Sequence, residues 1–345
     1  MSGSTASASA DPAARELVVS VNWIGDAIMA IPAVQETLRR RPDLRLSVLA
    51  RGGLAALWRL FDGPIDVIGY QGRPGLHHPV FNDLRQRRFS RAWILPNSFR
   101  TAWIATRAGI PVRTGFGRGL QFPLINDRRG VSSSPDRRHQ AWEYLELMDP
   151  DPSRAAIPFP RLAVPAAAAA ATWTRLGAWS DPVIGMIPGA ARGPSKRWPP
   201  EHFIATARRF AAAGCRIALF GGPDDQPVCS TIAAALGPAA LDYAGRTSLA
   251  EWATLLSACA LVVANDSGGM HLAAALDRPV VALYGMTDPD RTGPLGRRCT
   301  ILQRGGPRAR DIPRDSTEAR ARLAAISPDE VIAAARALGL PVEVT

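Results

Sequence analysis

The chain has 345 residues, of which 47% are apolar and 21% are charged, and its formal net charge is +11. This length predicts two domains, because a single hydrophobic core stops growing at roughly 250–300 residues. No stretch approaches the roughly 18 consecutive apolar residues that cross a bilayer, and residues 1–15 lack the apolar segment of a signal peptide. The four cysteines form no CxxC pair, which argues against a disulfide framework or a zinc site. We therefore expect a soluble cytoplasmic protein with a disordered tail over residues 1–15 and no bound metal.

The positive charge is unevenly distributed along the chain. Between Leu84 and Asn126 the sequence contains eight arginines and no acidic residue. This stretch predicts an anionic partner, such as the phosphate groups of a substrate or a membrane, and the alternative is a solvated basic face. Lys196 is the only lysine among the 41 basic residues. A compact ammonium group at this position favours a site that a planar guanidinium would not suit.

The N-terminal half alternates short apolar or β-branched runs with helical patterns, which is typical of a parallel sheet with crossover helices. The runs that predict strands are Glu16–Val21, Leu44–Leu49, Ile65–Ile68, Arg91–Leu95 and Val112–Phe116. The segments that predict helices are Ala27–Arg40, Leu54–Phe61 and Phe99–Ala108.

Two stretches lack the hydrophobic periodicity of a helix or a strand and therefore predict the boundary between the domains. They are Asp127–His139 and Asp149–Pro165. The second half repeats the pattern, with helices expected to begin near Pro200, Asp225, Leu249 and Gly268 and strands at Val183–Ile187, Arg216–Phe220, Leu261–Ala264 and Val280–Tyr284. We predict an α/β fold with two doubly wound, Rossmann-like domains over residues 16–165 and 166–345. In such sheets ligands bind beyond the carboxyl ends of the strands, so the site is expected in the strand-to-helix loops.

The first of these loops places Asp26 at the start of a helix, directly after the first strand. A carboxylate in a first turn often only caps the helix or complements its dipole. The same position also suits a general base that accepts a proton from a hydroxyl nucleophile. The sequence leaves both interpretations open.

Two loops of the second half predict a diphosphate site. Gly189, Ala190 and Lys196 follow the strand Val183–Ile187, where glycines permit close backbone approach and the ammonium group supplies charge. The strand Leu261–Ala264 runs through Asn265 into a turn, Asp266-Ser267-Gly268-Gly269, and the helix after it carries His271. The free N–H groups at that helix start would bind an anion. The alternatives are an irregular surface loop, a capping role for Asp266 and a purely structural His271.

Two further residues are candidates for contacts with a nucleoside. Asp225 follows the strand Arg216–Phe220 and could accept hydrogen bonds from ribose hydroxyls, and Thr247 could pass beside a nucleobase. A helix cap is the alternative for both residues.

Several spaced motifs, taken in order, resemble the ADP-heptose:lipopolysaccharide heptosyltransferases of glycosyltransferase family 9, most closely those of the second type. The resemblance covers nearly the whole chain after Glu16. The motifs are Trp23-Ile24-Gly25-Asp26, Leu95-Pro96-Asn97-Ser98-Phe99, Ala108–Pro111, Arg113-Thr114-Gly115, Pro188-Gly189-Ala190, Lys196–Pro199, Asn265–Gly268, Met270-His271, Ala273–Leu276, Arg278-Pro279 and Ala282–Gly285.

The resemblance implies a GT-B architecture and an inverting, metal-independent transfer of heptose from ADP-heptose, without a further cofactor. It implies Asp26 as the catalytic base and Lys196 as the lysine that faces the donor phosphates. The donor would be bound by Gly189, Ala190, Lys196, Asp225, Thr247, Asp266, Ser267, Gly268 and His271. A lipid A core acceptor would be bound by Asn97, Arg100, Arg113 and Arg118. Gly269 stands where the family has a bulkier apolar residue, which predicts a looser turn.

The expected partners are ADP-heptose, the core oligosaccharide acceptor and, through charge, the inner face of the cytoplasmic membrane. A first-type heptosyltransferase or another family 9 enzyme is the alternative within this class. Outside it, a nicotinamide-dependent oxidoreductase lacks the GxGxxG motif after the first strand. A non-catalytic nucleic-acid binder lacks a basic and aromatic platform. The acceptor hydroxyl, the donor epimer and the oligomeric state stay open.

Overall fold

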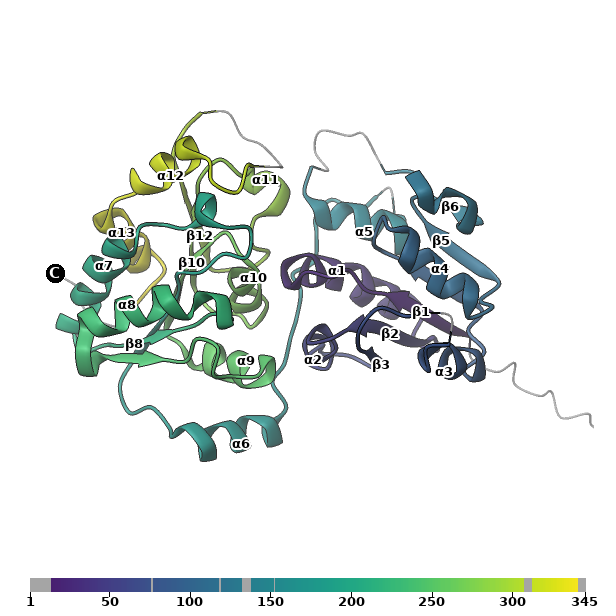
Figure 1. Cartoon of the computed structure of the whole chain (residues 1–345), viewed down its shortest axis with the longest axis horizontal. Coiled ribbons are helices and arrows are strands. Elements are labelled where there is room, and N and C mark those ends of the chain that lie inside the picture. Colours follow the sequence, from purple (N-terminus) through teal and green to yellow (C-terminus); the bar gives the residue numbers. More distant parts are fainter. Residues whose placement is uncertain are drawn as a thin grey trace, which may run out of the picture.

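The computed structural model describes residues 14–75, 77–117, 119–131, 138–151, 153–306 and 312–340. Residues 1–13 of the expected tail and residues 132–137 of the expected boundary therefore lie outside the described residues. The chain forms two lobes, each with a parallel sheet covered by helices (Figure 1). The first lobe consists of β1 (Arg15–Val19), α1 (Ile24–Arg40), β2 (Arg45–Arg51), α2 (Leu54–Trp58), β3 (Ile65–Tyr70), α3 (Val80–Gln86), β4 (Arg91–Ile94), α4 (Phe99–Arg107), β5 (Val112–Gly115), the 3-10 helix η1 (Gly119–Leu124), β6 (Asp127–Arg128) and α5 (Gln140–Met148).

The second lobe follows a connecting segment, residues 149–165, that has no helix or strand of its own in its described part. The elements of this lobe are α6 (Ala166–Leu176), β7 (Val183–Ile187), η3 (Pro194–Lys196), α7 (Pro200–Ala212), β8 (Arg216–Leu219), η4 (Pro223–Asp225), α8 (Gln226–Leu236), η5 (Gly237–Ala239), β9 (Ala240–Asp242), α9 (Leu249–Ala258), β10 (Leu261–Asn265), α10 (Gly268–Ala275), β11 (Val280–Tyr284), α11 (Pro289–Thr292), β12 (Cys299–Gln303), α12 (Thr317–Ala324) and α13 (Pro328–Ala337).

The two sheets have the same topology. The first has the strand order β3-β2-β1-β4-β5-β6 and the second has β12-β11-β10-β7-β8-β9, and every pair of neighbouring strands is parallel. Counted from its own first strand, each sheet therefore has the order 3-2-1-4-5-6 of the doubly wound nucleotide-binding fold. This order confirms the predicted α/β class. It also places a switch point between β1 and β4 in one domain and between β7 and β10 in the other.

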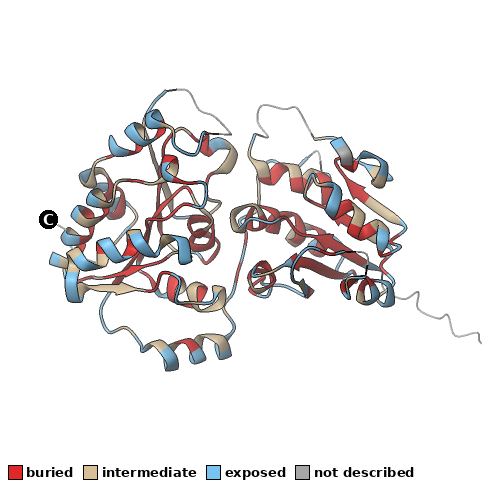
Figure 2. Cartoon of the chain, in the orientation of Figure 1, coloured by how far each residue is buried: buried red, intermediate tan, exposed pale blue. Residues whose placement is uncertain are grey.

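The central strands form because their side chains are apolar on both faces. All five residues of β7, β10 and β11 are buried, as expected for a parallel sheet with helices on both sides. Figure 2 shows this buried centre in both lobes, and it shows α6 largely exposed on the outside. The edge strands β9 and β12 are only partly buried.

Several elements differ from the predicted ones. Arg15 belongs to β1 rather than to the tail, and β6 lies at the start of a stretch predicted to be irregular. The sequence patterns did not predict α3, α5, α6, α12, α13, β9 or β12. Of these elements, α5 matters most for function, because it packs along α1 and brings its first residue beside Asp26.

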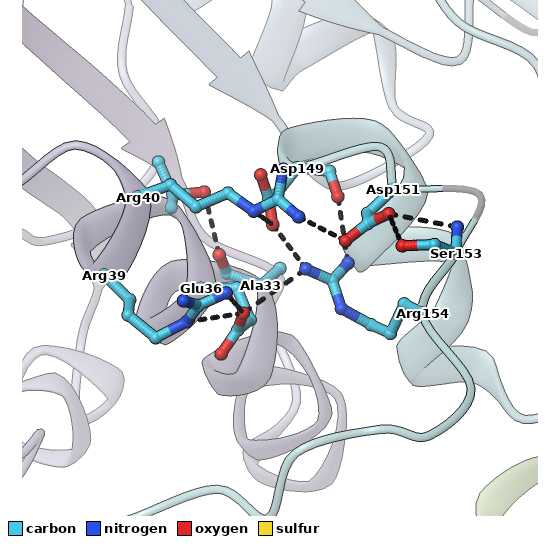
Figure 3. A network of polar contacts seen from close by, with 9 residues as sticks. Ala33, Glu36, Arg39, Arg40, Asp149, Asp151, Ser153 and Arg154 are labelled. Atoms are coloured by element: carbon cyan, nitrogen blue, oxygen red, sulfur yellow. Dashed lines mark hydrogen bonds and ion pairs between the residues drawn. The ribbon is translucent and has the colours of Figure 1, made fainter.

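A network of ion pairs holds the start of the connecting segment to the far end of α1 (Figure 3). The side chain of Arg154, which is only 8% exposed, pairs with Asp149 at 2.5 Å and with Glu36 at 3.3 Å. Arg40 reaches Asp149 at 3.3 Å and also pairs with Asp151. Breaking a buried pair leaves an uncompensated charge, so these contacts fix where the chain leaves the first domain.

The arginine stretch from Leu84 to Asn126 is less free than its sequence indicates, because acidic partners come from outside it. Arg87 pairs with Asp83 at 2.7 Å and also with Asp66, while Arg91 pairs with Asp127 at 2.5 Å. These two arginines precede or begin β4, at the amino edge of the sheet, whereas ligands are expected at the carboxyl edge. Arg87 and Arg91 therefore offer less positive charge to an anionic partner than the sequence indicates.

Candidate active site

The carboxyl ends of the two sheets face each other across a cleft between the domains. Loops that follow β1, β2 and β3 line it from the first domain, and loops that follow β7, β8 and β10 line it from the second. The switch point between β7 and β10 therefore opens into the cleft, opposite the loop after β1. This is the place that the doubly wound topology predicts for a ligand.

Asp26 lies in the first turn of α1, at the first-domain side of the cleft. Trp23 is the N-cap residue of α1 and provides no side-chain cap, so the charge of Asp26 complements the dipole of the helix. The Nε2 group of Gln140 donates to Oδ1 of Asp26 at 3.2 Å and to the hydroxyl oxygen of Tyr144 at 2.8 Å. Both N–H bonds of this amide are thus used, and α5 holds the carboxylate in place.

The second-domain side is built around the end of β10. Asn265 is fully buried, where it accepts from the backbone N–H of Trp198 at 3.0 Å and donates to the carbonyl of Pro188 at 2.7 Å. Asn265 therefore fixes both ends of the loop after β7 instead of binding a ligand itself. This loop brings the Nζ group of Lys196 into an ion pair with Asp266, and both side chains are close to 10% exposed.

The start of α10 offers unpaired donors to the cleft. Ser267 is its N-cap residue and makes no side-chain cap, and no partner for its buried Oγ occurs in the described part of the chain. The first N–H groups of an α-helix have no partner within the helix. Together with the dipole of α10, these groups form a site that suits an anion.

The cleft is divided into two connected cavities. The larger, of 890 Å³, is bounded by Gly189, Ala190 and Asp225 of the second domain and by Arg51 and Gln71 of the first. The smaller, of 160 Å³, contains the predicted residues Asp26, Lys196, Asp266 and His271. Residues that border both cavities are Trp23, Gly25, Ala191, Ser267 and Gly268.

Glycines allow the two helix starts to approach each other at the junction of the cavities. A Cβ atom on Gly25 would lie 2.9 Å from Cδ2 of His271, and one on Gly268 would lie 2.8 Å from Cβ of Ile24. Real Cβ atoms essentially never come so close. The contact between α1 and α10 therefore requires glycine at both positions.

The larger cavity has one carboxylate beside its backbone wall. Asp225 accepts from the N–H of Gly222 at 3.0 Å and pairs with Arg197 at 3.3 Å. A side chain at Gly189 would overlap its carboxylate group. Asp225 is therefore fixed against the loop after β7 and faces the cavity from its own loop.

The turn at Gly269 is not loosened by its missing side chain, contrary to the sequence-based expectation. A Cβ atom there would lie 2.7 Å from Cδ1 of Ile187 and 2.8 Å from Cζ2 of Trp252. The indole ring of Trp252 occupies the space and lines the larger cavity. Its buried Nε1 group makes no hydrogen bond within the described chain.

Some of the predicted residues lie outside both cavities. Thr247 lines neither of them, whereas Leu249, two residues further along the chain, lines the larger one. Asn97 and Arg100 are exposed after β4, at the same edge of the sheet but away from the cavity walls. Arg113 instead donates to the carbonyls of Ile110, Pro111 and Leu124, at 2.7 to 3.2 Å, because these loop carbonyls have no partner in the sheet. Arg118 lies outside the described residues.

The cavity walls also contain polar and aromatic residues that were not predicted from the sequence, and four of them bear on the site. They are Gln140, Trp252, Thr287 and Arg314. Thr287 could have been found, because it lies in the loop after the buried strand β11, as Asp266 lies in the loop after β10. The other three come from helices or loops whose contacts depend on tertiary packing.

His271 is kept neutral by its surroundings. The pKa of its imidazole is lowered to about 4, mainly by burial; Asp266 opposes this shift, and the smaller effects of His139 and Lys196 add to it. A neutral imidazole at the start of α10 is compatible with the positive end of the helix dipole. It can accept or donate a hydrogen bond in the smaller cavity at physiological pH.

This lowered pKa predicts a specific loss of stability in acid. In the unfolded chain the imidazole of His271 is protonated near pH 6.5, whereas in the folded chain it is protonated only near pH 4. The free energy of unfolding therefore falls as the pH drops from about 6.5 to about 4. We expect the free energy of unfolding to fall between about pH 7 and about pH 5 by about 2 kcal/mol less in His271→Gln than in the unmodified protein, as measured by urea unfolding. The control is His77→Gln, at an exposed position. The prediction would be contradicted if the unfolding free energy of His271→Gln depended on pH as steeply as that of the unmodified protein.

No metal-binding cluster is present in the described part of the chain, since nowhere in it do three or more His, Cys, Asp or Glu side chains gather suitably. In the same residues, no helix is both long and apolar enough to cross a membrane.

Two Rossmann-like domains that share one cleft, with an anion-binding helix start on one side, form the architecture of the GT-B class of sugar transferases. The chain belongs to glycosyltransferase family 9, the heptosyltransferases, whose family model matches residues 78–320. It is 33% identical over 309 residues to lipopolysaccharide heptosyltransferase 2 of Salmonella typhimurium, covering 83% of this chain and 87% of that protein. It is 32% identical over 308 residues to lipooligosaccharide heptosyltransferase 2 of Haemophilus influenzae, covering 83% and 88%.

Solved structures agree with this assignment. The structure of E. coli ADP-heptose LPS heptosyltransferase II matches with a TM-score of 0.82 and 30% identity, covering 94% of this chain and 98% of that chain. E. coli heptosyltransferase WaaC with ADP matches with a TM-score of 0.70 at 20% identity, which shows the shared fold alone. The protein is thus a glycosyltransferase, and neither the oxidoreductase nor the nucleic-acid-binding alternative applies.

Proposed function

We propose that the protein transfers heptose from ADP-L-glycero-D-manno-heptose to the heptose of a lipopolysaccharide inner core, as a second-type heptosyltransferase. One observation carries the proposal: Asp26 of the first domain and the start of α10 in the second domain line the same small cavity. A base on one side and an anion-binding site on the other are what a sugar transfer to a hydroxyl group requires.

The donor would span both cavities. Its adenine and ribose fit the larger cavity, where Leu249 and Trp252 form an apolar wall and Asp225 offers a carboxylate to ribose hydroxyls. Its diphosphate would then lie at the shared border, beside Ser267 and the free N–H groups of α10.

In the reaction, the carboxylate of Asp26 takes the proton from the acceptor hydroxyl as its oxygen bonds to the anomeric carbon. The bond from that carbon to the β-phosphate oxygen breaks on the opposite side, which inverts the configuration. ADP leaves with the electron pair, and Lys196 and the start of α10 stabilise its charge. Gln140 orients the base through its hydrogen bond to Oδ1. In this scheme no step needs a metal ion.

The extent of the matches favours the second type of heptosyltransferase over the first. The heptosyltransferase 2 proteins of Salmonella typhimurium and Haemophilus influenzae align over 83% of the chain, although that of Campylobacter jejuni aligns over 32%. Lipopolysaccharide heptosyltransferase 1 of E. coli is 35% identical over 109 residues, or 31% of the chain. An acceptor of the second type already carries one heptose. It is a lipid-linked molecule, which implies that the enzyme works at the inner face of the cytoplasmic membrane as a peripheral protein.

Transfer assays with two acceptors test the proposal. The purified protein should move heptose from ADP-heptose to a core acceptor that carries one heptose, but not to a core acceptor that carries none, and the product is detected by mass spectrometry. Turnover should survive a chelator such as EDTA. Transfer only to the acceptor without heptose would indicate the first type, and transfer to neither would indicate another activity of the family.

A further inference from the structure

Large apolar side chains are exposed at only a few positions of the described chain. They are Trp23, Phe99, Phe122, Phe159 and Ile301. Trp23 lines the cleft, and it follows β1. Phe99 and Phe122 follow β4 and β5, so they lie at the same carboxyl edge of the first sheet but outside both cavities.

The segments that carry Phe99 and Phe122 pack against each other. Phe99 is the first residue of α4, and α4 packs against η1, which contains Phe122. The Nε2 group of Gln121 donates to the carbonyl of Pro96 at 2.9 Å, which ties η1 to the loop after β4. The exposed fractions of the two phenylalanines are 49% and 52%. Packing within the chain therefore leaves about half of the surface of each phenylalanine exposed.

The charge around these rings is positive. The guanidinium group of Arg128 lies 3.7 Å from the ring centre of Phe122. Arg100 is exposed in the first turn of α4, where the helix dipole disfavours a cation. The sequence of the loops after β1 to β5, residues 20–23, 52–53, 71–79, 95–98 and 116–126, contains no Asp or Glu. The loops around the two rings are thus complementary to an anionic surface, while Asp26, in the first turn of α1, lines the cleft.

We propose that the Phe99–Phe122 patch, made of Phe99, Arg100, Phe122 and Arg128, docks the enzyme on an anionic lipid membrane. The two rings enter the headgroup region, where aromatic side chains are favoured, and the arginines bind lipid phosphates. The patch shares its sheet edge with the mouth of the cleft, so docking would direct the cleft toward acceptors in that membrane. The purpose of docking rests on the proposed function, but the docking itself can be measured separately.

Vesicle binding tests the proposal with the full chain. The protein should co-sediment with vesicles of phosphatidylethanolamine and phosphatidylglycerol and bind phosphatidylcholine vesicles weakly, and added salt should weaken the binding. Phe99→Ser/Phe122→Ser should bind the anionic vesicles at least about tenfold more weakly, because both apolar anchors are lost. Phe159→Ser is the matched control, since this residue is 44% exposed in the segment between the domains, and it should bind like the unmodified protein.

Three results would overturn the proposal. The first is equal vesicle binding by the double variant and the unmodified protein, and the second is no binding by the unmodified protein. The third is loss of an oligomer in the double variant, measured by light scattering, at unchanged vesicle binding, which would assign the patch to a second copy of the chain. Thermal unfolding shows whether the double variant is folded, and substitution of half-exposed residues should change stability little.

Two acceptors separate docking from transfer. On acceptor embedded in anionic vesicles, the double variant should be slower than the unmodified protein, whereas on a water-soluble core oligosaccharide the two should be equally fast. An equal loss on both acceptors would place the rings in the acceptor site and overturn docking. If the unmodified protein binds vesicles but transfers heptose to neither acceptor, the proposed function fails and docking stands.

Discussion

Asp26→Asn is expected to lower kcat by about 10²–10⁴, because the carboxamide keeps the shape of the side chain but cannot accept the proton of the acceptor hydroxyl. Gln140 can still hydrogen-bond to the carboxamide oxygen, so the first turn of α1 should keep its position. Binding of ADP should change little, since the groups proposed for the diphosphate belong to the second domain. Steady-state kinetics and isothermal titration with ADP measure the two effects.

Asp83→Asn is the matched control for this experiment. Asp83 also lies in the first turn of a helix, α3, and complements its dipole, but it pairs with Arg87 far from the cleft. If the role of Asp26 were only to stabilise its helix, both variants would lower stability slightly and leave kcat nearly unchanged. Retention of most activity by Asp26→Asn would therefore remove the general base from the mechanism.

The buried central strands of the two sheets could be predicted, because burial on both faces of a sheet gives each strand a continuous apolar run in the sequence. β7 and β11 have the predicted bounds, and each has five buried residues. β9 and β12 were missed because edge strands are only partly buried, which weakens the apolar pattern. α5 was missed because it has only nine residues and lies between two stretches rich in turn residues.

The residues of the candidate site were also predicted only in part. Residues in the loops after buried strands, such as Gly189, Asp225 and Asp266, were predicted and line the cavities, because parallel topology brings the strand ends together. Gln140 could not be found in this way, since its position depends on how α5 packs along α1. The free charge of the arginine stretch could not be judged from the sequence either, because it too depends on tertiary packing. Only the fold shows that Asp66 and Asp127 neutralise part of it.

Lys196→Met is expected to weaken ADP binding by about 10- to 100-fold, since a hydrogen bond to a charged group contributes about 1.5–3 kcal/mol. The same change leaves Asp266 as an unpaired carboxylate that is 9% exposed. The free energy of unfolding should therefore fall by about 3 kcal/mol. Lys196→Arg should restore the charge but not the full affinity, because a planar guanidinium is larger than an ammonium group in a cavity of 160 Å³.

The double variant Lys196→Met/Asp266→Asn separates the two roles of this lysine. Removing the carboxylate charge as well should recover most of the lost unfolding free energy, because no buried charge is then left unpaired. ADP affinity should stay low, since the cation beside the diphosphate is still missing. Recovery of both stability and ADP binding would mean that Lys196 only neutralises Asp266. In that case, the donor phosphates would be held by the start of α10 alone.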